Sequence, residues 1–207
     1  MRRALSLVLV GLLAASAAGC GGSNNKTATT ATTAHASTAP APATFPSNRL
    51  LVAGDLRGFA PQGQPTIVTS AKSWVSEYPP FEQEKERRRL EALGFVRGVS
   101  EHLVGSIKNG EGLSTAIQFR SPHSAVTDAE DEAKSPHFGA KTFAVTSIPG
   151  AKGFGGVFGS ETDYNVAFAV GPYYYLVGEG YATGTPGAPT REQLIAAAQR
   201  LYARVHR

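Results

Sequence analysis

The sequence predicts one α+β domain over residues 47–207, with an antiparallel sheet and helices packed mainly on one face. Three observations predict this class. Apolar and polar residues alternate in several short segments, as they do in half-buried strands. Asn-Gly, Pro-Gly and Gly-Pro pairs join these segments by short turns, which favours hairpins over parallel crossovers. Other segments carry the spacing and end signals of helices, and helices beside hairpin-connected strands are typical of α+β proteins.

Two helices are predicted in the first third of the domain. Residues 47–59, SNRLLVAGDLRGF, begin apolar and end in a Gly/Asp turn, which predicts a short helix that enters the fold. A longer helix is predicted over residues 81–93. Pro79 and Pro80 precede it, acidic residues fill its first turns, and Gly94 follows it. Proline before a helix and glycine after it are typical boundaries.

Three consecutive arginines, Arg87, Arg88 and Arg89, lie in the longer helix. Glu84 precedes the first two by three and four residues, the spacings that pair opposite charges on one helical face. We therefore interpret this segment as a solvated face whose charges pair with each other. A patch that binds an anionic ligand is the alternative.

Two strands follow, over residues 94–106 and 114–121. In the second strand apolar and polar side chains alternate, which is the period of a half-buried strand. Asn109 and Gly110 between the two strands form a hairpin turn signal. The two strands are therefore predicted to pair.

The strongest strand signal lies in residues 165–182, NVAFAVGPYYYLVGEGYA. Two further strands are predicted before it, over residues 141–150 and 152–160, with a Pro-Gly turn between them. Large apolar side chains alternate on both sides of the Gly171-Pro172 turn, at Val166, Phe168, Val170, Tyr173, Tyr175 and Val177. These positions are predicted to share one face of a hairpin.

Two more helices have recognisable first turns. One begins with Ser121 as its cap and Pro122 at its first position. Its apolar face is predicted to contain Ala125, Val126, Ala129 and Ala133. The last helix has Thr190 as its cap and Gln193 three residues later, as in a capping box. Its apolar stripe, predicted to dock on the sheet, contains Leu194, Ala197, Ala198, Leu201 and Val205.

Residues 1–19 predict a lipoprotein signal peptide. Arg2 and Arg3 are followed by the uncharged residues 4–18, which have the length of a secretory core and are shorter than the roughly 20 residues of a spanning helix. The small residues before Cys20 resemble the bacterial lipobox, in which signal peptidase cuts just before a lipid-modified cysteine. An ordinary signal peptide with an incidental cysteine is the alternative.

Cys20 is the only cysteine of the chain and so has no partner for an internal disulfide. We expect it to carry a diacylglyceryl group, with a further acyl chain such as palmitate on the new amino terminus. Two or more chains are needed for stable anchoring. The expected location is the extracytoplasmic face of the cell membrane.

Residues 20–46 predict a disordered tether rich in Thr, Ala and Pro. The segment lacks large aliphatic side chains, and Phe45 is its one aromatic residue, so it buries too little apolar surface to fold. The whole chain has 20 basic and 16 acidic side chains. Three of the basic ones precede residue 45, which leaves the domain close to neutral. Nucleic acid is therefore not an expected partner.

The domain resembles a group of actinobacterial surface lipoproteins, in the segments LLVAGDLRGF, FRSPHSA, SIPGAKGFG and VAFAVGPYYYLVGEG. It is more loosely similar to the extracellular sensor domains of mycobacterial serine/threonine kinases and to PsbP-like lipoproteins. This resemblance covers most of residues 47–207. It implies binding or sensing outside the cell and implies no catalytic residues.

No catalytic or metal-binding motif is recognisable. The sequence has no nucleophile elbow, no HExxH motif, no P-loop and no SxxK motif. His102, His123 and His137 fall within the domain, and acidic residues lie between the last two. Neighbouring acids on one helix point in different directions, so we predict no metal site and no cofactor. We also predict that the protein is not an enzyme.

Tyrosines are the best candidates for a ligand or partner site. Consecutive residues of a strand point to opposite faces, so Tyr173, Tyr174 and Tyr175 cannot all face one core. Tyr164 and Trp74 are predicted to lie near them and to belong to the site, and Tyr181 is a further neighbour. A tyrosine combines an apolar ring with a polar hydroxyl, which suits a binding site. Ordinary packing on the sheet is the alternative.

The sequence therefore predicts a lipid-anchored, extracytoplasmic lipoprotein with a non-catalytic binding domain. The expected partner is a small ligand, a lipid or an envelope protein. Two alternatives stay open: an envelope hydrolase with an unrecognised site, and a structural scaffold of the cell envelope.

Overall fold

The computed structural model describes residues 45–107, 110–134 and 141–207. Several sequence predictions lie outside these residues: the signal peptide, lipidation of Cys20, the tether up to residue 44, Asn109 of the first hairpin turn, and His137. No helix in the described ranges is both long and apolar enough to span a bilayer.

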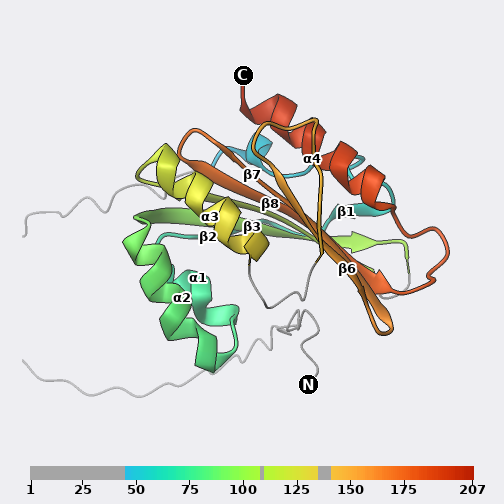
Figure 1. Ribbon diagram of the computed structural model, residues 1–207, viewed down its shortest axis with the longest axis horizontal. Helices are drawn as coiled ribbons and strands as arrows, with labels where there is room; N and C mark the ends of the chain where they lie inside the picture. Colours follow the sequence, from blue (N-terminus) through green and yellow to red (C-terminus); the bar gives the residue numbers. More distant parts are fainter. Residues whose placement is uncertain (1–44, 108–109, 135–140) are drawn as a thin grey trace, which may run out of the picture. The chain divides into compact units, whose positions relative to one another are not determined.

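The described residues form an antiparallel sheet of eight strands (Figure 1). The strands are β1 (Phe59–Pro61), β2 (Thr66–Val68), β3 (Phe95–Gly105), β4 (Glu111–Phe119), β5 (Lys141–Phe143), β6 (Lys152–Phe158), β7 (Glu161–Val170) and β8 (Tyr173–Ala182). Their order across the sheet is β1-β3-β4-β8-β7-β6-β5, and β2 also pairs with β3. The α+β class with an antiparallel sheet is confirmed.

Four α-helices and two 3₁₀ turns lie in the described residues. They are the 3₁₀ turns Ser47–Arg49 and Val75–Glu77, and the helices α1 (Ala71–Trp74), α2 (Pro80–Ala92), α3 (Pro122–Lys134) and α4 (Arg191–Val205). Helices α1, α2 and α3 pack on one face of the sheet, whereas α4 packs on the other (Figure 1). Most helices therefore share one face, as predicted, and α4 alone covers the second.

The core has two parts because side chains of alternate strand residues enter opposite layers. Val166, Phe168, Tyr175 and Val177 belong to the layer under α4. Tyr174 belongs to the layer under α2 and α3. The predicted hairpin of β7 and β8 is confirmed, with Phe168 paired across the strands with Tyr175.

The first turns of the helices form as the sequence predicts. In α4, the Thr190 hydroxyl accepts from the Gln193 amide at 3.4 Å, and the Gln193 side chain accepts from the Thr190 amide at 2.9 Å. In α3, Ser121 Oγ accepts from the Ser124 amide at 3.1 Å. Each cap satisfies amides that have no partner within the helix.

The predicted inner face of α3 is wrong at one position. Val126 is 47% exposed, whereas Asp128 is buried. The physical reason is that Arg89 of α2 reaches Asp128, with Nη1 2.6 Å from Oδ1. A buried carboxylate is tolerated when a cation pairs with it, and this pairing turns a polar residue inward.

Two other predicted elements are shorter in the structure than the sequence predicts. Residues 47–59 contain one 3₁₀ turn rather than a longer helix, and only Lys141–Phe143 of the predicted strand over 141–150 is extended. The strands β1 and β2 and the helix α1 have no counterpart in the predictions. They have three or four residues each, which is too short for a periodic pattern to be recognised.

The loop from Leu50 to Leu56 is fastened to α4 by a buried ion pair. Arg204 Nη2 lies 2.7 Å from Asp55 Oδ2, and Arg204 Nη1 lies 3.1 Å from Asp55 Oδ1. Arg204 also donates to the carbonyl of Leu50 at 2.9 Å, and Asp55 accepts from the amide of Val52 at 2.9 Å. The start of the domain is thereby tied to its last helix.

Candidate functional site

The structure does not gather the five predicted site residues in one place. Trp74 and Tyr174 lie in the layer under α2 and α3. Tyr173 and Tyr175 lie under α4, where the chain enters the domain, whereas Tyr164 lies on that same face beside the start of α4. Of the five, only Tyr164 lines one of the depressions described below.

Tyr173 and Tyr175 hold the first residues of the domain. The Arg49 guanidinium lies 3.8 Å from the centre of the Tyr173 ring and donates to the Tyr175 hydroxyl. The Phe45 ring meets Tyr173 edge-on at 6.1 Å, and Tyr175 is stacked on Phe168 at 5.0 Å. Such pairs contribute about 0.5–1.5 kcal/mol each beyond their burial. These two tyrosines therefore have a structural use.

Trp74 and Tyr174 are core residues of the opposite layer. The Trp74 ring lies against Gly98, where an added Cβ would approach to 2.4 Å, and packs near Phe95 at 6.1 Å. Tyr174 is 3% exposed. Glycine at residue 98 thus makes room for the indole ring.

Beside the start of α4 is an open depression of about 470 Å³, which we call the tyrosine pocket. Its lining residues are Tyr164, Tyr181, Thr185, Ala188, Pro189, Thr190, Arg191 and Glu192. The two tyrosines come from β7 and β8, Arg191 and Glu192 come from the first turn of α4, and the other residues come from the loop that leads into α4. The volume is within the range of small-molecule sites, and the mixture of rings and hydroxyls suits such a site.

The walls of the tyrosine pocket are held by specific contacts. The Tyr181 hydroxyl donates to the carbonyl of Pro189 at 2.9 Å, which fixes the loop against β8. The Tyr164 ring meets Phe143 edge-on at 6.0 Å. The Arg191 guanidinium lies 5.3 Å from the centre of the same Phe143 ring. Each ring of the pocket is therefore held by a specific contact, Tyr181 by Pro189 of the lining and Tyr164 by Phe143 outside it.

Glu179 carries a buried carboxyl group and is a neighbour of both tyrosines in the pairing of β7 with β8. Glu179 is paired across the strands with Tyr164 and precedes Tyr181 by two residues, so all three share the α4 face of the sheet. The residue is 2% exposed, and neither carboxyl oxygen has a hydrogen-bond partner among the described residues. Uncompensated burial of this kind is unfavourable and marks a candidate functional group.

Burial shifts the pKa of the Glu179 carboxyl group. Desolvation, together with a smaller effect of the Asp163 carboxylate, raises the pKa of Glu179 to about 8. The pKa of Tyr181 is raised to about 12 by burial and by the charge of Glu179. Burial also raises the pKa of Asp163 to about 6.

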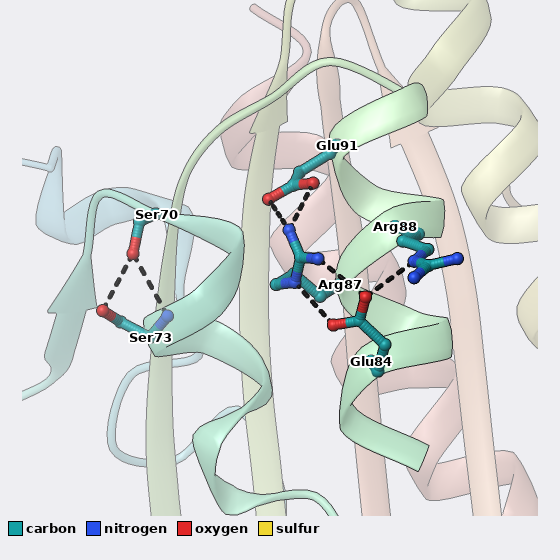
Figure 2. Close-up of polar contacts among 6 residues, drawn as sticks. All are labelled: Ser70, Ser73, Glu84, Arg87, Arg88 and Glu91. Carbon is teal, nitrogen blue, oxygen red and sulfur yellow. Dashed lines mark hydrogen bonds and ion pairs between the residues drawn. The ribbon is translucent and has the colours of Figure 1, made fainter.

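The arginine triplet does not form an anion site, because each of its three side chains already pairs with carboxylates. Figure 2 shows Arg87 between Glu84 and Glu91, at 2.8 and 2.7 Å, and Arg88 paired with Glu84 at 2.7 Å. Arg89 pairs with Glu86 and Asp128, both at 2.6 Å. The interpretation as a self-paired face fits these contacts.

Two further acidic residues, whose pKa is also raised, lie where α2 meets α3. Desolvation raises the pKa of Asp128 to about 6, although Arg89 acts to lower it. Desolvation likewise raises the pKa of Glu132 to about 7. Because Asp128 pairs with Arg89 and joins two helices, we assign this cluster a structural role.

A second open depression, of about 520 Å³, lies at β1 and the turn before it. It is lined by Gly54, Leu56, Arg57, Gly58, Phe59, Ala60, Val104 and Ser106. It contains one charged side chain and one hydroxyl group. Without several polar groups directed to one point it lacks the features of a selective site.

The histidines do not indicate a metal centre. His102 lies on β3 and His123 in the first turn of α3. Within the described residues, no three His, Cys, Asp or Glu side chains are grouped as metal ligands. His137 lies outside this part of the chain.

No protein-family model and no curated protein matches the chain. Two solved structures are similar to it. The extracellular domain of PknH from Mycobacterium tuberculosis is 9% identical, over 70% of this chain and 83% of that one, with a TM-score of 0.44. A putative uncharacterized protein (Rv0999 ortholog) from Mycobacterium smegmatis is 14% identical, over 73% and 90%, with a TM-score of 0.42. These values are too low to assign a family, a ligand or an activity.

Proposed function

We propose that this protein is a lipid-anchored, extracytoplasmic lipoprotein whose domain binds a small ligand in the tyrosine pocket and catalyses no reaction. The single observation that supports binding is that two tyrosines line the depression next to Glu179, which is paired across the strands with Tyr164 and whose buried carboxyl group has no hydrogen-bond partner among the described residues. Export and anchoring are supported by the pattern of residues 1–20. The tether would hold the binding domain away from the lipid surface.

Lipidation is tested by replacing Cys20 with alanine. The wild-type protein is expected to incorporate an alkyne analogue of palmitate and to remain in the membrane fraction. The Cys20→Ala variant is expected to lose the label, because the chain has no other cysteine, and to lose the mature, membrane-anchored form. Ser23→Ala serves as a nearby control that keeps both properties. Unchanged labelling and anchoring of Cys20→Ala would refute the lipoprotein proposal.

Ligand binding is tested by native mass spectrometry of the protein purified from its export route. The wild-type protein is expected to retain a small bound mass. Tyr164→Ala and Tyr181→Ala are each expected to weaken binding by about tenfold or more, since loss of a central aromatic contact generally costs more than 1 kcal/mol.

Phe81→Ala is the matched control for removal of an aromatic ring. Phe81 is 66% exposed on α2, remote in the fold from the tyrosine pocket. Its replacement is expected to leave the bound mass in place. A wild-type protein that carries no ligand and acquires none from an envelope extract would contradict the proposed function.

A further inference from the structure

We infer that the tyrosine pocket binds a small organic cation, for which Glu179 is the buried counter-charge. This inference rests on the proposed function of the pocket and names its ligand class. It is carried by three features. The first is the two aromatic rings of the lining. The second is the carboxyl group of Glu179, which is not part of the lining but is paired across the strands with Tyr164 and has no hydrogen-bond partner among the described residues. The third is that the one basic side chain among the described lining residues, Arg191, is already paired.

The rings supply the first feature. Tyr164 and Tyr181 line the same depression from neighbouring strands. A cation within about 6 Å of an aromatic ring is attracted by the negative face of the ring, by roughly 0.5–2 kcal/mol depending on desolvation. Two rings on adjacent strands form the start of a cage for an ammonium group.

Glu179 supplies the second feature. Its two oxygens are buried, without a hydrogen-bond partner in the described residues. An ionised carboxylate in such a place is unfavourable until a positive charge comes near. A bound cation would supply that charge. Two opposite charges at a given distance attract each other more strongly through a protein interior than through water, because the interior screens them less. The bound cation and the Glu179 carboxylate therefore need not be in direct contact.

The local charges supply the third feature. Among the described lining residues, Arg191 is the one basic residue, and its Nη2 pairs with Glu192 Oε1 at 3.1 Å. Glu192 also accepts from the amide at the start of α4, and the hydrogen bonds there lower its pKa. Since the capping box and Glu192 already use this helix end, the pocket offers little to an anion.

The charged and titratable groups around Glu179 come from each neighbouring element. Asp163 and Tyr164 lie on β7, Tyr181 on β8, and Glu101 on β3 faces the same side of the sheet. On α4 the nearby groups are Arg191 and Glu192. Lys141 of β5 lies in the same cross-strand row, through Gly155 and Tyr164, but it is exposed and three strands away from Glu179. Apart from Lys141 and the paired Arg191, the groups in this set are acidic or phenolic, which favours a cationic ligand.

The test uses three probes of nearly the same shape and different charge: tetramethylammonium, tert-butanol and pivalate. Binding to the purified protein is followed by NMR and calorimetry. We expect tetramethylammonium to bind at least tenfold more tightly than the neutral and anionic probes. Because the cation pairs with ionised Glu179, its affinity is expected to rise about tenfold or more between pH 6 and pH 8.

Variants assign the effect to one carboxyl group. Glu179→Gln is expected to weaken tetramethylammonium binding about tenfold or more and to remove its dependence on pH. Glu161→Gln, an exposed acid at the start of β7, is the matched control and is expected to change the affinity less than twofold. A thermal unfolding curve of each variant verifies that it folds.

The outcomes separate this inference from the proposed function. Binding of tert-butanol or pivalate as tightly as the cation, with loss in Tyr181→Ala, would overturn the cation inference and leave a ligand pocket. Unchanged affinity in Glu179→Gln would overturn the role of the counter-charge. No binding of any of the three probes would overturn the inference as a whole, and the ligand search above then decides the proposed function.

Discussion

Replacing Asp55 by alanine is expected to lower the free energy of unfolding by about 3–5 kcal/mol, the usual loss when one partner of a buried ion pair is removed. Asp55 is 5% exposed and accepts two hydrogen bonds from Arg204. Its removal leaves the Arg204 guanidinium without its carboxylate partner and releases the amide of Val52. Urea denaturation of the purified protein measures the loss.

Two further variants identify the source of this loss. Asp55→Asn retains an acceptor for the Val52 amide but not the charge, so it is expected to be intermediate. Arg200→Met is expected to cost less than Asp55→Ala, because the Arg200 side chain is 50% exposed, its Nε lies 3.7 Å from Asp55 Oδ1, and its Nη2 donates to the main-chain carbonyl of Asp55 rather than to the carboxylate. Equal stability of Asp55→Ala and the wild-type protein would show that the ion pair does not fasten the loop to α4.

The second large effect is a loss of stability as the pH rises. The folded-state pKa of Glu179 is raised from 4.5 to about 8, so between these values the folded protein binds more protons than the unfolded chain. Stability from this group is therefore present below about pH 4.5 and is lost as the pH rises through 8. At 1.36 kcal/mol per pKa unit, the loss is up to about 5 kcal/mol.

Glu179→Gln isolates this contribution. Near pH 5 the variant and the wild-type protein are expected to have similar stability, because both then hold a neutral, unpartnered group. At pH 9 the variant is expected to be more stable by a few kcal/mol. Denaturation curves at these two pH values test the sign, and a wild-type protein that gains stability between them more steeply than the variant would contradict it.

Glu179→Leu extends the same test by removing the polar group altogether. It is expected to be more stable than the wild-type protein at both pH values, by about 1–3 kcal/mol near pH 5, because no polar group remains without a partner. A substitution that stabilises the fold and weakens ligand binding is typical of a site residue, since binding groups are often kept at the expense of stability.

Of the candidate pocket, the sequence predicts Tyr164 as a site residue and Tyr181 as a neighbour of the site, and the other lining residues are not among its predictions. The sequence also contains a signal for Glu179, although Glu179 is not among the predicted site residues. In the segment VGEGYA it lies between Val177 and Tyr181 at inward positions of the alternating pattern. A carboxylate at a core position of a strand breaks the binary pattern and points to a functional or paired group.

The sequence by itself determined the elements whose signals are local. Alternation over residues 165–182 specifies the β7–β8 hairpin, and Thr190 with Gln193 specifies where α4 begins. These signals depend on neighbours within a few residues, because strand faces repeat every second residue and caps join residues three apart.

Only the tertiary structure decided which side chains meet. Alternation sends Tyr174 and Tyr175 to opposite faces, and the tertiary structure covers both faces, so that each ring is buried in its own layer. The tertiary structure brought Arg204 to Asp55 across 149 residues of sequence. It also turned Asp128 inward to meet Arg89. Such contacts depend on the packing of elements that are distant in the chain, which no local period records. The buried Glu179 beside two tyrosines is a result of the same packing.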